Sequence, residues 1–333
     1  LLSQKDQQPE YVVVGLPDEL YRKCHVTNYH DKQLGDVHRD LRRAFKALAM
    51  KYRIPTQFDR QQTEDGMEKD HPSKVTWNFF TGLYFKAGGF PWGPTALNPG
   101  TCYVGISFYR SLGSLFSSMH TSLAQAFDEH GEGLVLRGPD FSWDADEQGT
   151  ASPHLESALA ESLLNLVLDR YQKETGQTPK RVVVHKTSKY WPQERAGFKA
   201  TLEKRVQRFD LVALETRQSE VRLLTTSMYP PLRGTRFTVG DVDYLYTTGF
   251  LADLGQYHSM HVPSPIQVAD HVGQDTPRED LLKEILVLTK MNWNSSRLGG
   301  KSPITLRFSQ LVGEIMREIP EGVEPLPQFK FYM

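Results

Sequence analysis

Three short apolar runs, rich in β-branched residues, constrain the fold of this chain more than any other feature. They are YVVVG (residues 11–15), YVGIS (residues 103–107) and RVVVH (residues 181–185). Runs that are apolar on both faces are typical of strands buried inside a parallel sheet. Segments with a helical apolar period lie between them, so the sequence predicts an α/β fold.

The first hundred residues alternate between expected strands and expected helices. Strands are expected at residues 11–15 and 53–59, and helices at residues 36–52 and 75–89. Asp36 is a candidate N-cap of the first helix, and Gly88 and Gly89 end the second. The segment FPWGPTALNPG (residues 90–100) contains three prolines and predicts a boundary near residue 95. We therefore expect a first domain over residues 1–95.

After this boundary the expected strands come first. Three strands are expected at residues 101–110, 117–127 and 131–138, followed by a helix at 154–175, a strand at 181–185, a helix at 191–206 and a strand at 209–216. Further strands are expected at residues 221–226, 236–239 and 244–250, and two closing helices at 277–289 and 305–319. Three meandering strands followed by helix, strand, helix and strand is the order of an RNase H-like domain, which we expect over residues 96–333.

Composition excludes some classes of protein. The net charge of −1 and the pI of about 6.9 give no general basic field, so any binding of nucleic acid requires a local basic patch. Cys24 and Cys102 are expected to be buried thiols in a reducing compartment. No apolar run is long enough to span a membrane and no leader is recognisable, so we expect a cytoplasmic protein. Because the chain opens at Leu1, we expect a fragment or the ordered part of a longer protein.

Two segments carry a family resemblance: TWNFFTGLYFKAGGFPW (residues 76–92) and LTKMNWNSSRLGGKSPITLRFSQLVGEI (residues 288–315). With them, the chain resembles the MID and PIWI domains of prokaryotic Argonaute proteins, most like the inactive short or long-B branches. The resemblance implies that residues 1–95 form the later part of a Rossmann-like MID domain. Residues 96–333 then form a complete PIWI domain with a mixed central sheet. In this family, MID holds the 5′ end of a guide strand and PIWI holds the guide–target duplex.

The resemblance also implies a site for the guide 5′-phosphate, which requires several hydrogen-bond donors and positive charge. Its residues in this sequence are His38, Arg42, Lys46, Gln57, Lys86, Lys290 and Met333. His38 and Arg42 would lie on one helical face at i and i+4, where the family more commonly has Tyr and Lys. A main-chain carboxylate at Met333, together with Gln57, would allow one Mg²⁺ at the guide 5′ end. From the residues alone, a solvated His–Arg face and a helix-capping Lys86 remain the alternatives.

At the positions where the family's nuclease members carry metal-binding carboxylates, this chain has Ser107, Thr187 and Gln310. Hydroxyl and amide groups cannot offset the charge of two neighbouring divalent cations. A fourth carboxylate could come from Asp144, Asp146 or Glu147 in a loop, although a solvated acidic loop explains them as well. We therefore expect no catalytic metals and no enzyme activity.

Contacts with the backbone of the duplex are expected from Lys186, Arg233, Arg236 and Arg297, and such contacts are independent of base sequence. Lys189 is a weaker candidate, since surface lysines are common. Trp77, Trp92 and Trp293 are expected to fill the core rather than to stack on bases.

These observations lead to a functional hypothesis. The chain binds a 5′-phosphorylated guide, for which RNA is favoured, and recognises a complementary target, for which DNA is favoured, without cleaving it. By family analogy it activates an effector, such as a nuclease or a TIR or sirtuin-like protein with an APAZ domain, in defence against plasmids or phage. Two alternatives stay open: an active nuclease using Asp144, Asp146 or Asp243, and an interaction module without a guide. The sequence also leaves open the guide chemistry, the effector, any domain before Leu1 and the oligomeric state.

Overall fold

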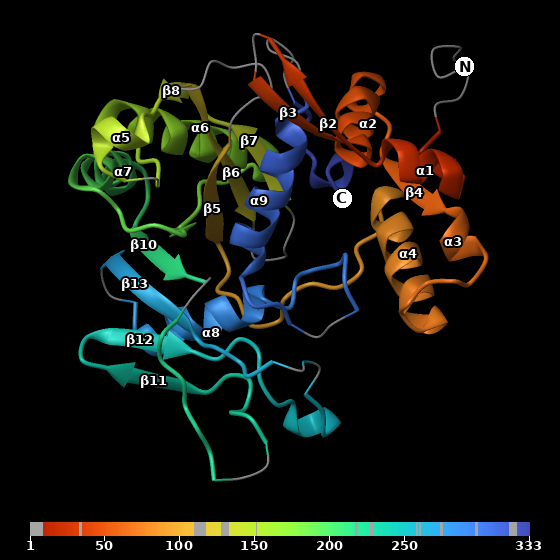
Figure 1. The fold of residues 1–333 in the computed structure, drawn as a ribbon. Coiled ribbons are helices and arrows are strands. Elements are labelled where there is room, and N and C mark those ends of the chain that lie inside the picture. The colour runs from red at the N-terminus through yellow and green to blue at the C-terminus, as the bar shows by residue number, and fades with distance from the viewer. Residues whose placement is uncertain are drawn as a thin grey trace.

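The computed structural model describes residues 9–32, 35–109, 118–127, 133–150, 152–216, 219–226, 229–257, 259, 261–273, 276–296, 299–319 and 325–333. Its first part holds a two-stranded parallel sheet in which β1 (Val12–Leu16) pairs with β4 (Thr56–Arg60). Between these strands lie α1 (Asp18–Cys24), the hairpin β2 (Val26–Asp31) and β3 (Gly35–Asp40), α2 (Leu41–Ala49) and the 3₁₀ turn η1 (Met50–Tyr52). After β4 come α3 (Gln61–Glu64) and α4 (Pro72–Lys86), which lie on the right-hand side of Figure 1.

The helix expected at residues 36–52 begins later than predicted, at Leu41. Its N-cap is Asp40, whose carboxylate accepts a 2.9 Å hydrogen bond from the backbone N–H of Arg43. The residues before it belong to β3, where Val37 is buried and its neighbour His38 is exposed. The prediction of Asp36 as the cap was wrong because residues 35–40 pair with β2 in an antiparallel hairpin, so the chain becomes helical only at Leu41.

The second part is built on a mixed sheet of nine strands in the described chain. The strands are β5 (Thr101–Tyr109), β6 (Ser118–Phe127), β7 (Gly133–Arg137), β8 (Asp140–Ser142), β9 (Arg181–Lys186), β10 (Arg208–Glu215), β11 (Arg236–Val239), β12 (Val242–Leu245) and β13 (Ile266–Gly273). Their spatial order is β11-β12-β13-β10-β9-β5-β6-β7, with β8 beside β6. β9 runs parallel to both β5 and β10, and the other neighbours are antiparallel. The RNase H-like order expected from the sequence is confirmed.

The strand expected at residues 244–250 is shorter and begins earlier, as β12 (Val242–Leu245), one expected strand is absent, and some strands were not predicted. Residues 221–226 form no strand, and the sheet instead contains β13, which was not predicted. β13 reads IQVADHVG, and polar residues follow each other at Asp270 and His271. Both side chains are held by partners in the fold: Asp270 by Arg195 and His271 by Asp210. These tertiary partners cannot be recognised from the local sequence pattern, so β13 was not predicted.

Helices cover both faces of the large sheet (Figure 1). These helices are α5 (Ala145–Gln148), α6 (Ser157–Thr175), α7 (Pro192–Arg205), α8 (Arg278–Leu288) and α9 (Ile304–Met316), with 3₁₀ turns η2 (Ala252–Leu254) and η3 (Phe329–Phe331). Alternate residues of β5 face opposite layers: Val104 and Ile106 pack with α6 and α7, whereas Tyr103 and Tyr109 pack with α8 and α9. The chain therefore has a three-layer core around β5 and β9.

Gly105 lets α9 approach the sheet closely. A Cβ at this position would overlap the backbone of Thr305 in the first turn of α9. On the neighbouring strand, His185 lies 2.9 Å from the Thr305 hydroxyl. The first turn of α9 is thus fixed against β5 and β9, and the rest of α9 crosses the sheet from there.

The two cysteines differ in how deeply they are buried. Cys102 is buried and Cys24 is partly buried, and among the described residues neither takes part in a disulfide. In the described residues, no helix combines the length and the apolar character needed to cross a bilayer.

Candidate functional site

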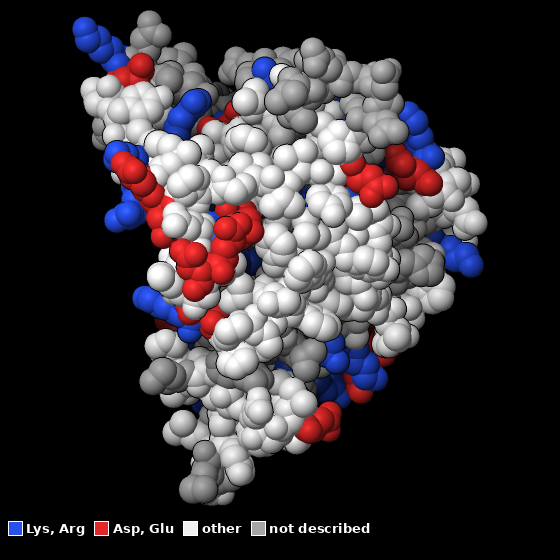
Figure 2. Space-filling view, turned by 90° about the vertical axis from the view of Figure 1, so that its right-hand side faces the viewer, with Lys and Arg blue, Asp and Glu red and all other residues white. Residues whose placement is uncertain are grey.

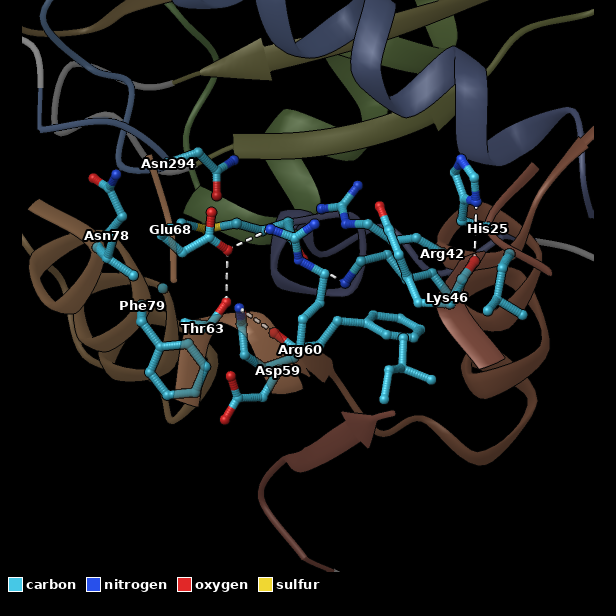
Figure 3. A pocket seen from close by; sticks show the side chains of 18 of the residues that line it. His25, Arg42, Lys46, Asp59, Arg60, Thr63, Glu68, Asn78, Phe79 and Asn294 are labelled. Atoms are coloured by element: carbon cyan, nitrogen blue, oxygen red, sulfur yellow. Dashed lines mark hydrogen bonds and ion pairs between the residues drawn. The ribbon is translucent and has the colours of Figure 1, made fainter. Parts of the chain in front are cut away.

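A cavity of about 440 Å³ lies between the small parallel sheet, α2 and α4 (Figure 3). Its wall combines two basic residues of α2 with polar residues of β4, with Val75, Asn78, Phe79 and Gly82 of α4, and with Asn294 and Met333. The polar and charged lining includes Arg42, Lys46, Gln57, Asp59, Arg60, Thr63, Glu68, Asn78 and Asn294, and Met333 closes one side. Segments far apart in the sequence therefore build a single site.

Two lysines with buried side chains supply positive charge to this cavity. Lys46, on α2, is 2% exposed and donates hydrogen bonds to the backbone oxygens of Thr56 (2.8 Å) and Met333 (2.5 Å). Lys86, in the last turn of α4, is also 2% exposed and donates to the side-chain oxygen of Gln57. The Thr56 carbonyl that accepts from Lys46 and the Gln57 amide oxygen that accepts from Lys86 are neutral, and among the described residues no Asp or Glu side chain is paired with either lysine. Their charges are therefore left for a bound anion to balance.

Crowding of cations changes the proton affinity of these side chains. Burial lowers the pKa of Lys86 to about 7, and the positive charge of Arg42 contributes to this shift. Burial also lowers the pKa of Lys46 well below its usual value, followed by repulsion from Lys86 and Arg42. Arg42 is reached by solvent through the cavity mouth, yet the surrounding protein lowers its pKa as well. An anion bound here would relieve this repulsion.

The structure brings together most residues predicted for the 5′-phosphate site. Arg42, Lys46, Gln57 and Met333 line the cavity, and Lys86 lies directly behind Gln57. The grouping of these side chains in one place agrees with the prediction, whereas their binding of a phosphate remains untested by the geometry.

Two predicted residues lie elsewhere. His38 is on β3 rather than on the helix of Arg42, and its Nδ1 lies 2.6 Å from Asn28 Oδ1 on β2, outside the cavity wall. The expected i, i+4 face was wrong because the helix starts at Leu41. Lys290 is exposed just after α8, and its backbone oxygen accepts a hydrogen bond from Trp92; it is not part of the wall either.

The sequence prediction missed one end of the cavity. Tyr21 and His25 stack with ring centroids 4.9 Å apart, and the Arg60 guanidinium lies 5.1 Å from the Tyr21 ring centroid. Arg60 also donates to Glu68, which accepts a second hydrogen bond from Thr63 at 2.8 Å. These residues come from α1, β4, α3 and a loop, with no regular spacing. Only the tertiary fold could reveal them.

The predicted Mg²⁺ does not fit the oxygens that were to hold it. Gln57 Oε1 accepts a hydrogen bond from Lys86, and the backbone oxygen of Met333 accepts one from Lys46. A divalent cation at these two oxygens would lie beside two ammonium groups and Arg42, and charge repulsion opposes its binding. The lysines themselves occupy the places that a metal would need.

The three positions that lack carboxylates lie at neighbouring structural elements. Gly105 pairs with His185 in the parallel ladder of β5 and β9, so Ser107, within β5, and Thr187, directly after β9, lie at the same end of adjacent strands. The Ser107 hydroxyl is buried without a hydrogen-bond partner among the described residues, whereas Thr187 and Gln310 are exposed. In the described chain, no group of three His, Cys, Asp or Glu side chains has a geometry that could hold a metal ion.

Of the three carboxylates considered as unconventional ligands, Asp144 and Asp243 are engaged and Asp146 is exposed on α5. Asp144 caps α5 through hydrogen bonds from the backbone of Asp146 (2.9 Å) and Glu147 (3.3 Å). Asp243, on β12, forms a 2.6 Å ion pair with Arg278. In Figure 1, α5 lies at the upper left and β12 at the lower left, with β10 and β13 between them.

Most of the side chains that were predicted to contact the duplex form hydrogen bonds or ion pairs within the protein. Lys186 is 1% exposed and its ammonium lies 2.6 Å from the Glu194 carboxylate, so its prediction as a surface contact was wrong. Arg233 donates to the backbone oxygen of Leu286 (3.1 Å) and to the Thr289 hydroxyl (2.5 Å). Arg236 is on the surface in a 3.0 Å ion pair with Glu279. Arg297 lies outside the described residues.

Two of the three tryptophans expected in the core have indole N–H groups held by backbone oxygens: Trp293 by Trp92, and Trp92 by Lys290. Trp293 is 2% exposed, as expected. Trp77 is 55% exposed on α4, so for this residue the expectation was wrong.

A polar groove of about 690 Å³ continues from the cavity, and Asn78 and Asn294 line both. Its walls come from α4, the loop around Tyr257 and Ser259, and the first turns of α9. Basic side chains in its lining are Lys74, Lys301 and Arg307. Cavity and groove together form one continuous depression that extends from the buried lysines toward α9.

At the sequence level, no family profile and no curated protein matches this chain. Solved structures with a similar fold are Argonaute proteins. Clostridium butyricum Argonaute bound to a guide DNA and a 19-mer target DNA is 17% identical, with a TM-score of 0.66 over 94% of this chain and 38% of that one. Aa-Ago with externally bound siRNA is 19% identical, with a TM-score of 0.61 over 99% of this chain and 42% of that one. A crystal structure of A. aeolicus Argonaute is 20% identical, with a TM-score of 0.58 over 85% of this chain and 38% of that one. The chain thus has an Argonaute-like fold and spans about two fifths of the length of these proteins.

Proposed function

We propose that this chain binds the 5′-phosphorylated end of a short nucleic acid and uses the strand as a guide to bind a complementary strand. One observation carries the proposal: Arg42 and Lys46 line one cavity, Lys86 lies directly behind Gln57, and among the described residues no Asp or Glu side chain is paired with either lysine. A terminal phosphate supplies the missing negative charge and several acceptor oxygens. The adjoining groove offers the following nucleotides a polar path with Lys74, Lys301 and Arg307.

The 5′ end itself is the feature to test. Single strands of one sequence, with a 5′-phosphate or a 5′-hydroxyl, are titrated by fluorescence anisotropy. We expect the phosphorylated strand to bind at least about 100-fold more tightly, because a buried charge pair contributes about 2–5 kcal/mol. Equal affinities would remove the basis of the proposal.

The pH dependence of this binding follows from Lys86. In the free protein its pKa is lowered to about 7, and a bound phosphate raises it again, so binding takes up a proton above pH 7. The phosphate loses its second proton near pH 6. Affinity is therefore expected to rise up to about pH 6, peak between about 6 and 7 and fall above that by up to about tenfold per pH unit. Titrations across this range check the curve, and affinity that rises steadily above pH 7 contradicts it.

We further propose that the chain does not cleave the bound strands. Support comes from Ser107, Thr187 and Gln310, which offer no carboxylate where β5, β9 and α9 meet. Two-metal hydrolysis needs such carboxylates to hold the cations that activate water. Guide-loaded protein with a complementary DNA or RNA target and Mn²⁺ or Mg²⁺ is expected to give no product above the protein-free control. A specific cut within the paired region contradicts this prediction.

A protein that binds a target without cutting it needs another way to act. By analogy with inactive Argonaute proteins, duplex formation on this chain would activate an effector, a nuclease or a TIR or sirtuin-like protein, against plasmids or phage. RNA is the guide and DNA the target in this proposal. Sequencing the nucleic acids that co-purify with the protein tests it, since bound DNA guides without RNA would reverse the assignment.

A further inference from the structure

Helix α4 exposes a row of aromatic side chains that the proposed function does not use. Trp77, Phe80 and Tyr84 are 55%, 61% and 56% exposed. Their spacing of three and four residues places them on one helical face. The other exposed residues of this face, Ser73 and Thr76, are uncharged. A contiguous apolar face of this kind marks a site of interaction.

A second cavity, of about 230 Å³, opens beside this row. Its floor is apolar and includes Phe80, which packs edge-to-face on Phe79 with centroids 5.6 Å apart. Four carboxylate residues belong to its lining, and none of its described lining residues is Lys or Arg: Asp59, Glu64, Glu68 and Asp70. Two of these carboxylates are paired within the fold, Glu68 with Arg60 and Asp70 with Lys74 at 2.6 Å, so Asp59 and Glu64 give the hollow its remaining negative charge.

The surroundings add one carboxylate beyond the lining, Asp65, and one lysine, Lys69. The segment QQTEDGMEKD (residues 61–70), which contains α3, holds four acidic residues and one lysine. Figure 2 faces this side of the molecule and shows a broad uncharged area with acidic side chains gathered beside it. Phosphate groups would be repelled here, whereas a cationic and apolar ligand is complementary to the surface.

We propose that this surface, the α4 face (Trp77, Phe80, Tyr84 and the cavity beside Phe80), docks a basic amphipathic helix of a partner protein. The apolar side of that helix lies along the aromatic row, whose spacing suits packing of helix on helix. Its Lys or Arg side chains enter the hollow, where their aliphatic parts pack on Phe79 and Phe80 and their charged ends meet the carboxylates. The proposal is independent of guide binding.

Two synthetic peptides of about five helical turns test the chemistry of the partner. They share one pattern of leucines, and their polar positions are all Lys in one peptide and all Glu in the other. With dye-labelled peptides we expect the Lys peptide to bind at least about tenfold more tightly than the Glu peptide.

Variants then locate the binding. Trp77→Ser combined with Phe80→Ser is expected to weaken the Lys peptide at least about tenfold, since exposed aromatics are anchors of interfaces. Glu64→Lys, which leaves the aromatic row intact, weakens it as well and reduces its salt dependence. Leu166→Ser, at an exposed leucine of α6, serves as the matched control and leaves binding unchanged. Equal thermal midpoints of all variants show that the fold is retained.

Several results would overturn the proposal. These are equal affinities for the two peptides, and undiminished Lys-peptide binding by the Trp77→Ser/Phe80→Ser protein. A dimer in sedimentation that this variant abolishes would assign the face to a second copy of the chain. Displacement of the Lys peptide by a 5′-hydroxyl single strand, with weaker strand binding by the same variant, would assign it to nucleic acid.

Discussion

Replacing Arg42 by alanine is expected to weaken binding of a 5′-phosphorylated single strand about 100-fold. The guanidinium lines the cavity with Lys46, and a charge-assisted hydrogen bond in such a site contributes about 1.5–3 kcal/mol. Each 1.4 kcal/mol corresponds to about a tenfold change in Kd. The same strand with a 5′-hydroxyl has no group for Arg42 to hold, so its Kd is expected to change less than about threefold. Anisotropy titrations of both strands measure the difference.

Helix α2 supplies its own control for this experiment. Arg43 is adjacent to Arg42, but its guanidinium forms a 2.6 Å ion pair with Glu314 on α9 and lies outside the cavity wall. Arg43→Ala removes the same charge from the same helix and is expected to leave the affinity for the phosphorylated strand within about threefold of the original. If both variants weaken binding equally, the effect is one of general charge and the cavity is not the phosphate site.

Much of the large sheet could be predicted because its strands carry their own signal. All six residues of β9 are buried, and its sequence RVVVHK is apolar where a parallel central strand requires it. β5, β6 and β7 were also predicted from their own sequences, and they pair with one another in antiparallel order. The strands of the first domain were harder to predict. Residues 11–15 were correctly expected to form a parallel strand, yet Val13 on β1 is 43% exposed, because the small sheet has only two strands in the described chain.

The site was predictable only in part, for a physical reason. A family pattern put Lys86 and Gln57 in one site, and the two are hydrogen-bonded, but nothing in the local sequence shows that Lys86 is buried and Gln57 half-buried. Burial, rather than residue type, lowers the pKa of Lys86 and makes the cavity attractive to an anion. Lys186 is the opposite case. Its position at a strand end suggested a lysine that is accessible to a ligand, but in the fold its ammonium group is paired with Glu194.

The second large expected effect concerns this buried pair. Glu194→Ala is expected to lower the free energy of unfolding by about 3–5 kcal/mol, because it leaves the Lys186 ammonium buried without a counter-charge. The Glu194 carboxylate accepts hydrogen bonds from Lys186 at 2.6 and 2.7 Å, and Leu155 N–H donates to it at 3.3 Å. Burial would raise the pKa of Glu194, yet the hydrogen bond from His154 and the charge of Lys186 keep it below its usual value. Urea unfolding measures the loss.

The double variant Lys186→Met/Glu194→Leu separates charge from packing. It removes both charges and keeps apolar volume, so we expect it to recover most of the lost stability, to within about 1–2 kcal/mol of the original protein. The exposed Lys189→Ala, three residues from Lys186, is expected to change stability by less than about 0.5 kcal/mol. If Lys186 only supports the fold, the double variant also binds a guide–target duplex with unchanged affinity. A large loss of duplex affinity with full stability would instead return Lys186 to the nucleic-acid interface.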